Sequence, residues 1–270
     1  MRQRPFIYLK PREWGTFVLR SVASWWYMVH LGAIALVMAF APSTYNRENR
    51  IATSIYIYNS TWRVLPWFAL LSALVSLVLI RIVVVTALSY GLSRYALEMV
   101  VRVLILELIP LTAALFVALR AGLAFNAGDA RALLVASAAP SDKASARAQN
   151  RLRRDLVPQV IANAFAVLSL AMVSSVIVLV LAYMNVYGGS PWGVLEYTRT
   201  VGRVFNPAVT AGFILKTIFF GLAVAIIPTA AILEVSRFGN YSTSTVQPGA
   251  MRLLIVLLLI EAGSLAVKYI

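Results

Sequence analysis

The sequence predicts an all-α integral membrane protein, with an N-terminal interfacial or elbow helix followed by five transmembrane helices. Two observations support this class. Of the 270 residues, 61% are hydrophobic and the mean hydropathy is +0.82, whereas soluble domains are roughly 45–50% apolar. The hydrophobic residues also form continuous runs rather than an alternating pattern, and about 20 such residues in a helix cross a hydrocarbon core.

Six apolar blocks can be read along the chain, at residues 20–42, 64–93, 97–123, 157–187, 206–233 and 251–270. Both flanks of the first block are basic, and basic flanks prefer the cytoplasmic side of a membrane. A block with both ends on one side does not cross, so we expect this aromatic-rich block to lie in the interface. The chain then divides into an N-terminal basic segment at 1–61 and a five-span domain at 62–270.

The longest polar stretch sets the orientation of the five spans. Residues 124–156 are rich in basic side chains, among them Arg131, Arg147, Arg151, Arg153 and Arg154. The excess of positive charge predicts that this loop is cytoplasmic. The N-terminus is then cytoplasmic as well, and the C-terminus is extracytoplasmic. Residues 141–156 can form a basic amphipathic helix, which would be either a solvated connector or a docking helix for a cytoplasmic partner.

Two opposite charges lie at the same depth in different spans. Counted from residues 97 and 206, where their spans enter, Glu107 and Lys216 each lie about 15 Å deep at 1.5 Å per residue. A charge at the bilayer centre costs about 2.5–3.5 kcal/mol, which an opposite charge on a neighbouring helix can offset. The sequence leaves two interpretations of this pair open, a salt bridge that fixes helix packing or part of a transport pathway.

The remaining intramembrane charges are more scattered. Arg81 also lies within a span, and we expect it to line or brace the same cavity. Arg120 and Glu234 fall near cytoplasmic span ends, and Arg120 is expected to anchor its span among lipid phosphates. Glu261 is in the middle of the last block, where the sequence identifies no partner for it.

Composition and motifs argue against chemistry by this chain alone. It has no cysteine and one histidine, which excludes thiolate metal sites and multi-histidine clusters. The phosphate-binding pattern G-x-x-x-x-G-K-[ST], the nucleophile elbow G-x-S-x-G and the zinc motif H-E-x-x-H do not occur. We therefore expect no catalytic residue and no directly bound cofactor. The net charge of +14 indicates topology and anionic head groups rather than a nucleic-acid partner.

Residues 104–122 read LILELIPLTAALFVALRAG. This segment resembles the permease family called MlaE or YrbE, the membrane subunits of ABC transporters that work with MCE proteins on lipids. The family pattern is R-E-L-G-P, an apolar stretch and G-R-x-G, and four positions match it at the expected spacing: Glu107, Pro110, Arg120 and Gly122. Three positions depart from it: Leu106, Ile109 and Leu119. Leu215-Lys216-Thr217 looks like part of the penultimate span of the family.

The resemblance implies a permease subunit that moves phospholipid or a similar lipid, in a bacterial inner membrane. It implies three protein partners: a cytoplasmic ATPase that uses ATP, an extracytoplasmic MCE protein and a second permease subunit, identical or not. Glu107 and Lys216 would line or brace the cavity, Pro110 would shape its helix, and the loop 124–156 would transmit ATPase motion.

One departure and two alternatives accompany this interpretation. The family usually carries glutamates after G-R-x-G, whereas residues 123–154 contain none, so contacts with an ATPase must differ here. The first alternative is a secondary transporter driven by an ion gradient. The second is a scaffold subunit that transports nothing and whose charges only fix helix packing.

Overall fold

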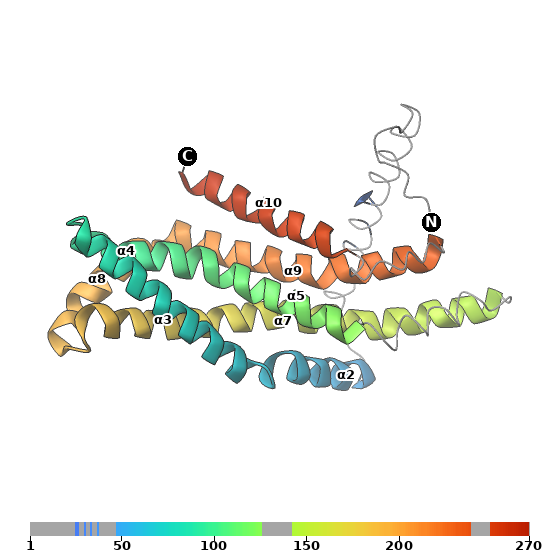
Figure 1. Ribbon diagram of the computed structural model, residues 1–270. Coiled ribbons are helices and arrows are strands. Elements are labelled where there is room, and N and C mark those ends of the chain that lie inside the picture. The colour runs from blue at the N-terminus through green and yellow to red at the C-terminus, as the bar shows by residue number, and fades with distance from the viewer. Residues whose placement is uncertain are drawn as a thin grey trace, which may run out of the picture.

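The computed structural model describes residues 47–125, 142–238 and 249–269, together with single positions 25, 26, 30, 33 and 37. Within these ranges the chain is helical apart from short turns (Figure 1). Apart from those five positions, the predicted interfacial block at 20–42 lies outside the described residues, as does Arg131.

Five helices of the described chain are long and apolar enough to cross a membrane, which confirms the predicted number. They cover Thr53–Ser89, Tyr95–Ala121, Pro158–Tyr187, Pro207–Pro228 and Ala250–Val267. In their most apolar windows the second and fourth spans are 56% and 50% buried, whereas the first and last are 17% and 11% buried. The second and fourth spans are therefore the most buried of the five, and the first and last are the least buried.

The first span starts earlier than the hydropathy of the sequence predicts. Helix α2 (Arg47–Ile57) continues through a π-helix, η2 (Tyr58–Trp62), and a short turn into α3 (Leu65–Ser89). A proline near the start of α3 suits this position, since the first turn of a helix needs no amide donor there. Gly91, with φ of +72°, then turns the chain towards the second span, a backbone conformation that glycine adopts without strain.

The second span is one path built from three segments. Helix α4 (Ser93–Val100) leads into a second π-helix, η3 (Val101–Leu108), and then into α5 (Ile109–Phe125). A π-helix is rare and occurs often at functional sites, because its wider turn redirects backbone and side-chain groups. Here η3 contains Glu107, and Pro110 is the second residue of α5, which follows η3.

Helix α7 (Asp142–Tyr187) is the longest element and lies at the centre of the bundle, packing against α2, α3, α5 and α9. Its first part, residues 142–157, precedes the third span and extends it by about 24 Å at 1.5 Å per residue. This half of the predicted loop is therefore a helix, as the sequence indicated, but it is continuous with the span. Arg147, Arg151, Arg153 and Arg154 all lie on this extension.

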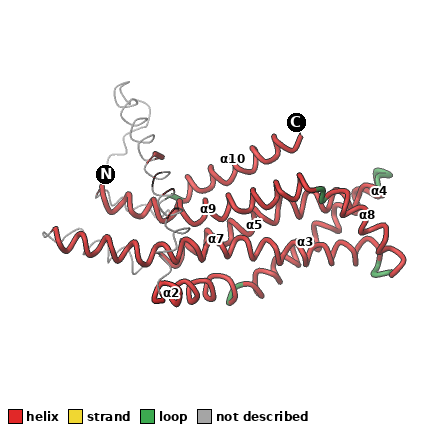
Figure 2. The backbone as a smooth tube through the Cα atoms, turned by 180° about the vertical axis from the view of Figure 1, so that it is seen from behind, coloured by secondary structure: helices red, strands yellow, loops and turns green. Residues whose placement is uncertain are grey.

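The stretch between the apolar blocks at 157–187 and 206–233 contains a helix that the hydropathy did not indicate. After the short 3-10 turn η4 (Pro191–Gly193) comes α8 (Val194–Val204), followed by α9 (Pro207–Phe238) and α10 (Ala250–Tyr269). Helix α10 packs mainly against α9 and diverges from it towards the C-terminus (Figures 1 and 2).

The helix ends alternate between the two ends of the bundle as the predicted crossings require. One end, which we call the α2 end, holds α2, the start of α7 and the end of α9 (Figure 1). The other, the α8 end, holds α4 and α8. The assignment of the α2 end to the cytoplasm stays a prediction.

A glycine allows α7 and α9 to approach closely. A Cβ atom added to Gly221 on α9 would lie 3.1 Å from the backbone oxygen of Ala164 on α7 and 3.3 Å from its Cα. Both neighbouring atoms belong to the backbone, so they cannot move aside as a flexible side chain would. The small side chains at this contact let the two helix backbones pack together, as small residues do in membrane helices.

Candidate functional site

Three charged side chains from three different helices meet inside the bundle. Lys216 on α9 is only 3% exposed. Its Nζ forms an ion pair and hydrogen bond with Glu107 Oε2 on η3, and it lies 2.8 Å from Glu261 Oε2 on α10. We call these three residues the ion cluster. One ammonium therefore holds two carboxylates, which offsets the cost of burying each of them.

The backbone of the second span also contributes to this cluster. Lys216 Nζ donates a hydrogen bond of 3.2 Å to the carbonyl oxygen of Leu106. In an α-helix this oxygen would accept from the amide four residues later, which is position 110, and proline has no amide hydrogen. Pro110, which is buried, thus leaves an acceptor for the ammonium. The same Nζ lies 5.7 Å from the centroid of the Phe220 ring.

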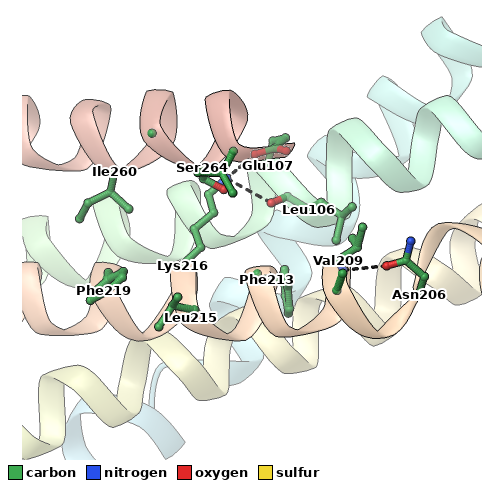
Figure 3. Close-up of a pocket in the computed structure, with 14 residues that line it drawn as sticks. Leu106, Glu107, Asn206, Val209, Phe213, Leu215, Lys216, Phe219, Ile260 and Ser264 are labelled. Carbon is green, nitrogen blue, oxygen red and sulfur yellow. Dashed lines mark hydrogen bonds and ion pairs between the residues drawn. The ribbon is translucent and has the colours of Figure 1, made fainter. Parts of the chain in front are cut away.

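A groove of about 680 Å³ opens beside the ion cluster, between α9, α10 and η3, where α10 diverges from α9 (Figure 3). Figure 3 shows Lys216 extending from α9 towards Glu107 and the Leu106 carbonyl. The groove is lined mostly by apolar side chains, with Glu107, Lys216, Asn206 and Ser264 as its polar members. Such an apolar site with a few convergent polar groups is typical of ligand-binding pockets.

The structure brings together the two residues that the sequence paired by depth. Glu107 and Lys216 both line the groove and are bonded to each other, so the pair braces the helices and faces a cavity at once. For the third member, Glu261, the sequence alone identifies no partner. Its depth, about 15 Å when counted from residue 251, was the signal that could have placed it beside them.

Arg81 lies elsewhere. Its side chain is exposed on α3, and it is not among the residues that line the groove. The expectation of a cavity residue at this position therefore does not agree with the structure. The position of a residue in a span gives its depth, whereas the face of a uniformly apolar helix cannot be read from its sequence.

Arg120 binds backbone rather than standing free at the end of its span. Its guanidinium donates from Nη1 to the carbonyl oxygen of Ser60 over 3.3 Å, and from Nη2 to that of Asn59. Both acceptors belong to the π-helix η2. These contacts differ from the expected anchoring among phosphates. Glu234 lies on α9 beyond its apolar window and towards the α2 end.

A tyrosine cluster fixes α8 to the end of α7. The hydroxyl of Tyr197 on α8 donates to the carbonyl oxygen of Leu179 over 2.8 Å, and that of Tyr183 donates to Ser190 over 2.6 Å. The rings of Tyr183 and Tyr197 pack edge to face, with centroids 5.1 Å apart. Burial raises the pKa of Tyr197 to about 12, because the ionised form would lose its hydration.

A comparison with protein-family models matches the family described as Permease MlaE over residues 53–264. This range takes in all three residues of the ion cluster and most of the last span. Comparison with curated proteins found no match, and comparison with solved structures found none either. The family match covers most of the chain and agrees with the five spans, so this multi-pass membrane protein belongs to the MlaE family of permeases.

Proposed function

We propose that the chain is the membrane subunit of an ABC-type transporter that moves phospholipid or a similar amphiphile. The observation that carries the proposal is the ion cluster in the wall of an apolar groove. A salt bridge that only fixed helix packing would not need to line a cavity. An amphiphile, in contrast, needs apolar walls for its chains and polar groups for its head, and the groove offers both.

The energy source in this proposal is a separate cytoplasmic ATPase, which binds and hydrolyses ATP, while the permease itself binds no cofactor. The extension of α7 supports this, because the same helix continues through Pro158 into the bundle, where it packs against α2, α3, α5 and α9. Its basic residues, Arg147, Arg151, Arg153 and Arg154, are the expected contacts with the ATPase. The α2 end then faces the cytoplasm of a bacterial inner membrane.

Two further partners complete the proposed assembly. An MCE protein would sit on the extracytoplasmic side, at the α8 end. A second permease subunit, identical or different, would close the open side of the groove. The poor burial of α10, which is 11% buried in its apolar window, supports a partner on this side. Charged groups facing a groove between spans also favour enclosure by protein over contact with lipid chains.

The first test is purification of the tagged chain from its native membrane in mild detergent, with mass spectrometry of the proteins and lipids that accompany it. We expect an ATPase and an MCE protein in fixed ratio, with retained lipid. The complex is then reconstituted into vesicles, and lipid transfer is compared with and without ATP for the wild type, Glu107→Gln and Lys216→Met. Loss of transfer with intact assembly supports the assigned roles.

The alternatives predict different results in the same experiments. Transfer that follows a proton or sodium gradient and ignores ATP would establish a secondary transporter. A stable complex without bound lipid and without transfer would establish a scaffold. Unchanged transfer in both variants would refute a transport role for the pair, even if the ATPase is present.

A further inference from the structure

The π-helix η2 leaves two backbone carbonyls without their usual donors. In an α-helix the carbonyls of Asn59 and Ser60 would accept from the amides of residues 63 and 64. Here the amide of Arg63 donates instead to Tyr58 over 3.2 Å, and that of Val64 donates to Thr61 over 3.2 Å. Carbonyls that lose their donors in this way need replacements when they are removed from water.

Arg120 supplies the replacement donors. One guanidinium reaches both oxygens, through Nη1 to Ser60 and Nη2 to Asn59. Two parallel N–H groups in a rigid plane suit two neighbouring carbonyls, whereas the single ammonium of a lysine does not offer this geometry. The two guanidinium N–H groups of Arg120 thus bind two neighbouring carbonyls and fix α5 onto the junction of α2 and α3.

The same π-helix is also tied to the central helix. The hydroxyl of Ser60 lies 2.7 Å from the carbonyl oxygen of Tyr56 and 3.4 Å from that of Ala162 on α7, so its single hydrogen is shared between the two acceptors. Helices α5 and α7 are the two elements that flank residues 126–141, the middle of the predicted coupling loop. The junction of α2 and α3 is therefore bonded to both sides of that loop.

From these contacts we propose that Arg120 and η2 form a latch. The latch sets the angle between α2 and α3. It also makes the first span move together with α5 and α7, the helices that flank residues 126–141. Arg120 is a positioning residue in this scheme and does not contact a transported molecule. The statement that loop motion reaches α3 rests on the proposed function, whereas the latch itself is a property of the isolated chain.

The latch can be tested by distance measurement between spin labels, because the chain contains no cysteine. Cysteines replace Ile55 on α2 and Ile82 on α3, which are exposed. The labelled wild type should give one narrow distance distribution. Arg120→Gln and Arg120→Lys should both broaden or shift it. Arg102→Gln is the matched control, since Arg102 lies in the same span and is paired with Glu98, and it should leave the distribution unchanged.

Arg120→Lys is the decisive variant, because it keeps the positive charge and loses the two parallel N–H donors of the guanidinium. A wild-type distribution in Arg120→Lys would overturn the latch and leave a purely electrostatic role for Arg120. In the complex with the ATPase, we expect Arg120→Lys to hydrolyse ATP at the wild-type rate with at least tenfold less lipid moved per ATP. If the wild type moves no lipid with ATP, the proposed function fails, and the label distances still decide whether the latch exists.

Discussion

Pro110 and Lys216 act on the same carbonyl oxygen. Pro110 lacks the amide hydrogen that would bind the Leu106 carbonyl in an α-helix, and Lys216 Nζ donates to that oxygen from another helix over 3.2 Å. The proline and the lysine thus have one structural explanation. The proline leaves a backbone carbonyl of the second span without its amide donor. The lysine of the fourth span donates to that carbonyl and also pairs with Glu107 and Glu261.

Replacing Pro110 with alanine should weaken this relationship. The new amide at position 110 can bind the Leu106 carbonyl, so Lys216 loses one acceptor and η3 is free to become an α-helix. We expect thermal stability in detergent to be unchanged or higher, since proline is unfavourable inside a helix, and lipid transfer to fall. Equal transfer in Pro110→Ala and the wild type would show that the opened carbonyl has no part in transport.

Removing the cation should destabilise the protein more than removing all three charges. Lys216→Met leaves two partly buried carboxylates beside each other without their cation, and a fully buried unpaired charge, the upper limit for this case, costs about 3–5 kcal/mol. The triple variant Lys216→Met, Glu107→Gln and Glu261→Gln removes the charges together and should recover most of the melting temperature without recovering transfer. If the triple variant is as unstable as Lys216→Met, the unpaired carboxylates are not the cause of the lower melting temperature of Lys216→Met.

Gly221→Ala should separate α7 from α9. The added Cβ meets backbone atoms of Ala164 at 3.1 and 3.3 Å, and overpacking of this kind costs about 1–3 kcal/mol. Gly212→Ala, in the same helix, is the control because its Cβ would meet nothing within 4 Å. It should be neutral or stabilise the helix by up to about 1 kcal/mol. Gly221→Ala should therefore melt at a lower temperature than the wild type, and Gly212→Ala should melt at the same or a higher temperature.

Filling the groove should reduce lipid retention without reducing stability. Gly263 lines the groove on α10, and a Cβ added there meets nothing within 4 Å. Gly263→Leu should fold normally and retain less lipid on purification, as measured by mass spectrometry. Gly202→Leu on α8, which also has open space around its Cβ and does not line the groove, should retain as much lipid as the wild type.

The tyrosine cluster should loosen at high pH. The pKa of Tyr197 is raised from 10.0 to about 12 in the folded protein, so folding favours the neutral phenol. Its contribution to stability is complete below pH 10 and is lost as the pH rises towards 12, because the unfolded chain ionises first. Tyr197→Phe should start less stable, having lost its hydrogen bond to Leu179, and should show less of this pH dependence.

Hydropathy and helical rise predicted the elements that depend on the bilayer. The five spans follow from the length of apolar runs, and the pairing of Glu107 with Lys216 follows from equal depth. These predictions succeed because a spanning helix runs across the membrane, so the number of residues along it gives the depth of each residue. The same count, applied to Glu261, would have completed the ion cluster.

Features that depend on contacts between neighbouring helices were not predicted. The side of α3 on which Arg81 lies cannot be read from the sequence, because α3 is apolar on all sides. The π-helices η2 and η3 depend on side chains that are distant in the sequence, since Arg120 and Lys216 supply donors to carbonyls of these segments. Helix α8 was missed because it is too short and too polar for a hydropathy criterion. Its buried residue Val204 and half-buried Tyr197 and Val201 recur at helical spacing.

The contact between Ala164 and Gly221 lies near the middle of α7. At 1.5 Å per residue, roughly 33 Å of helix separates it from Asp142 and roughly 35 Å from Tyr187. Because these two lengths are nearly equal, a tilt of α7 about this contact would displace its basic end and its α8 end by similar distances in opposite directions. A larger side chain at Gly221 is then expected to alter both ends of α7, although the contact itself lies far from either.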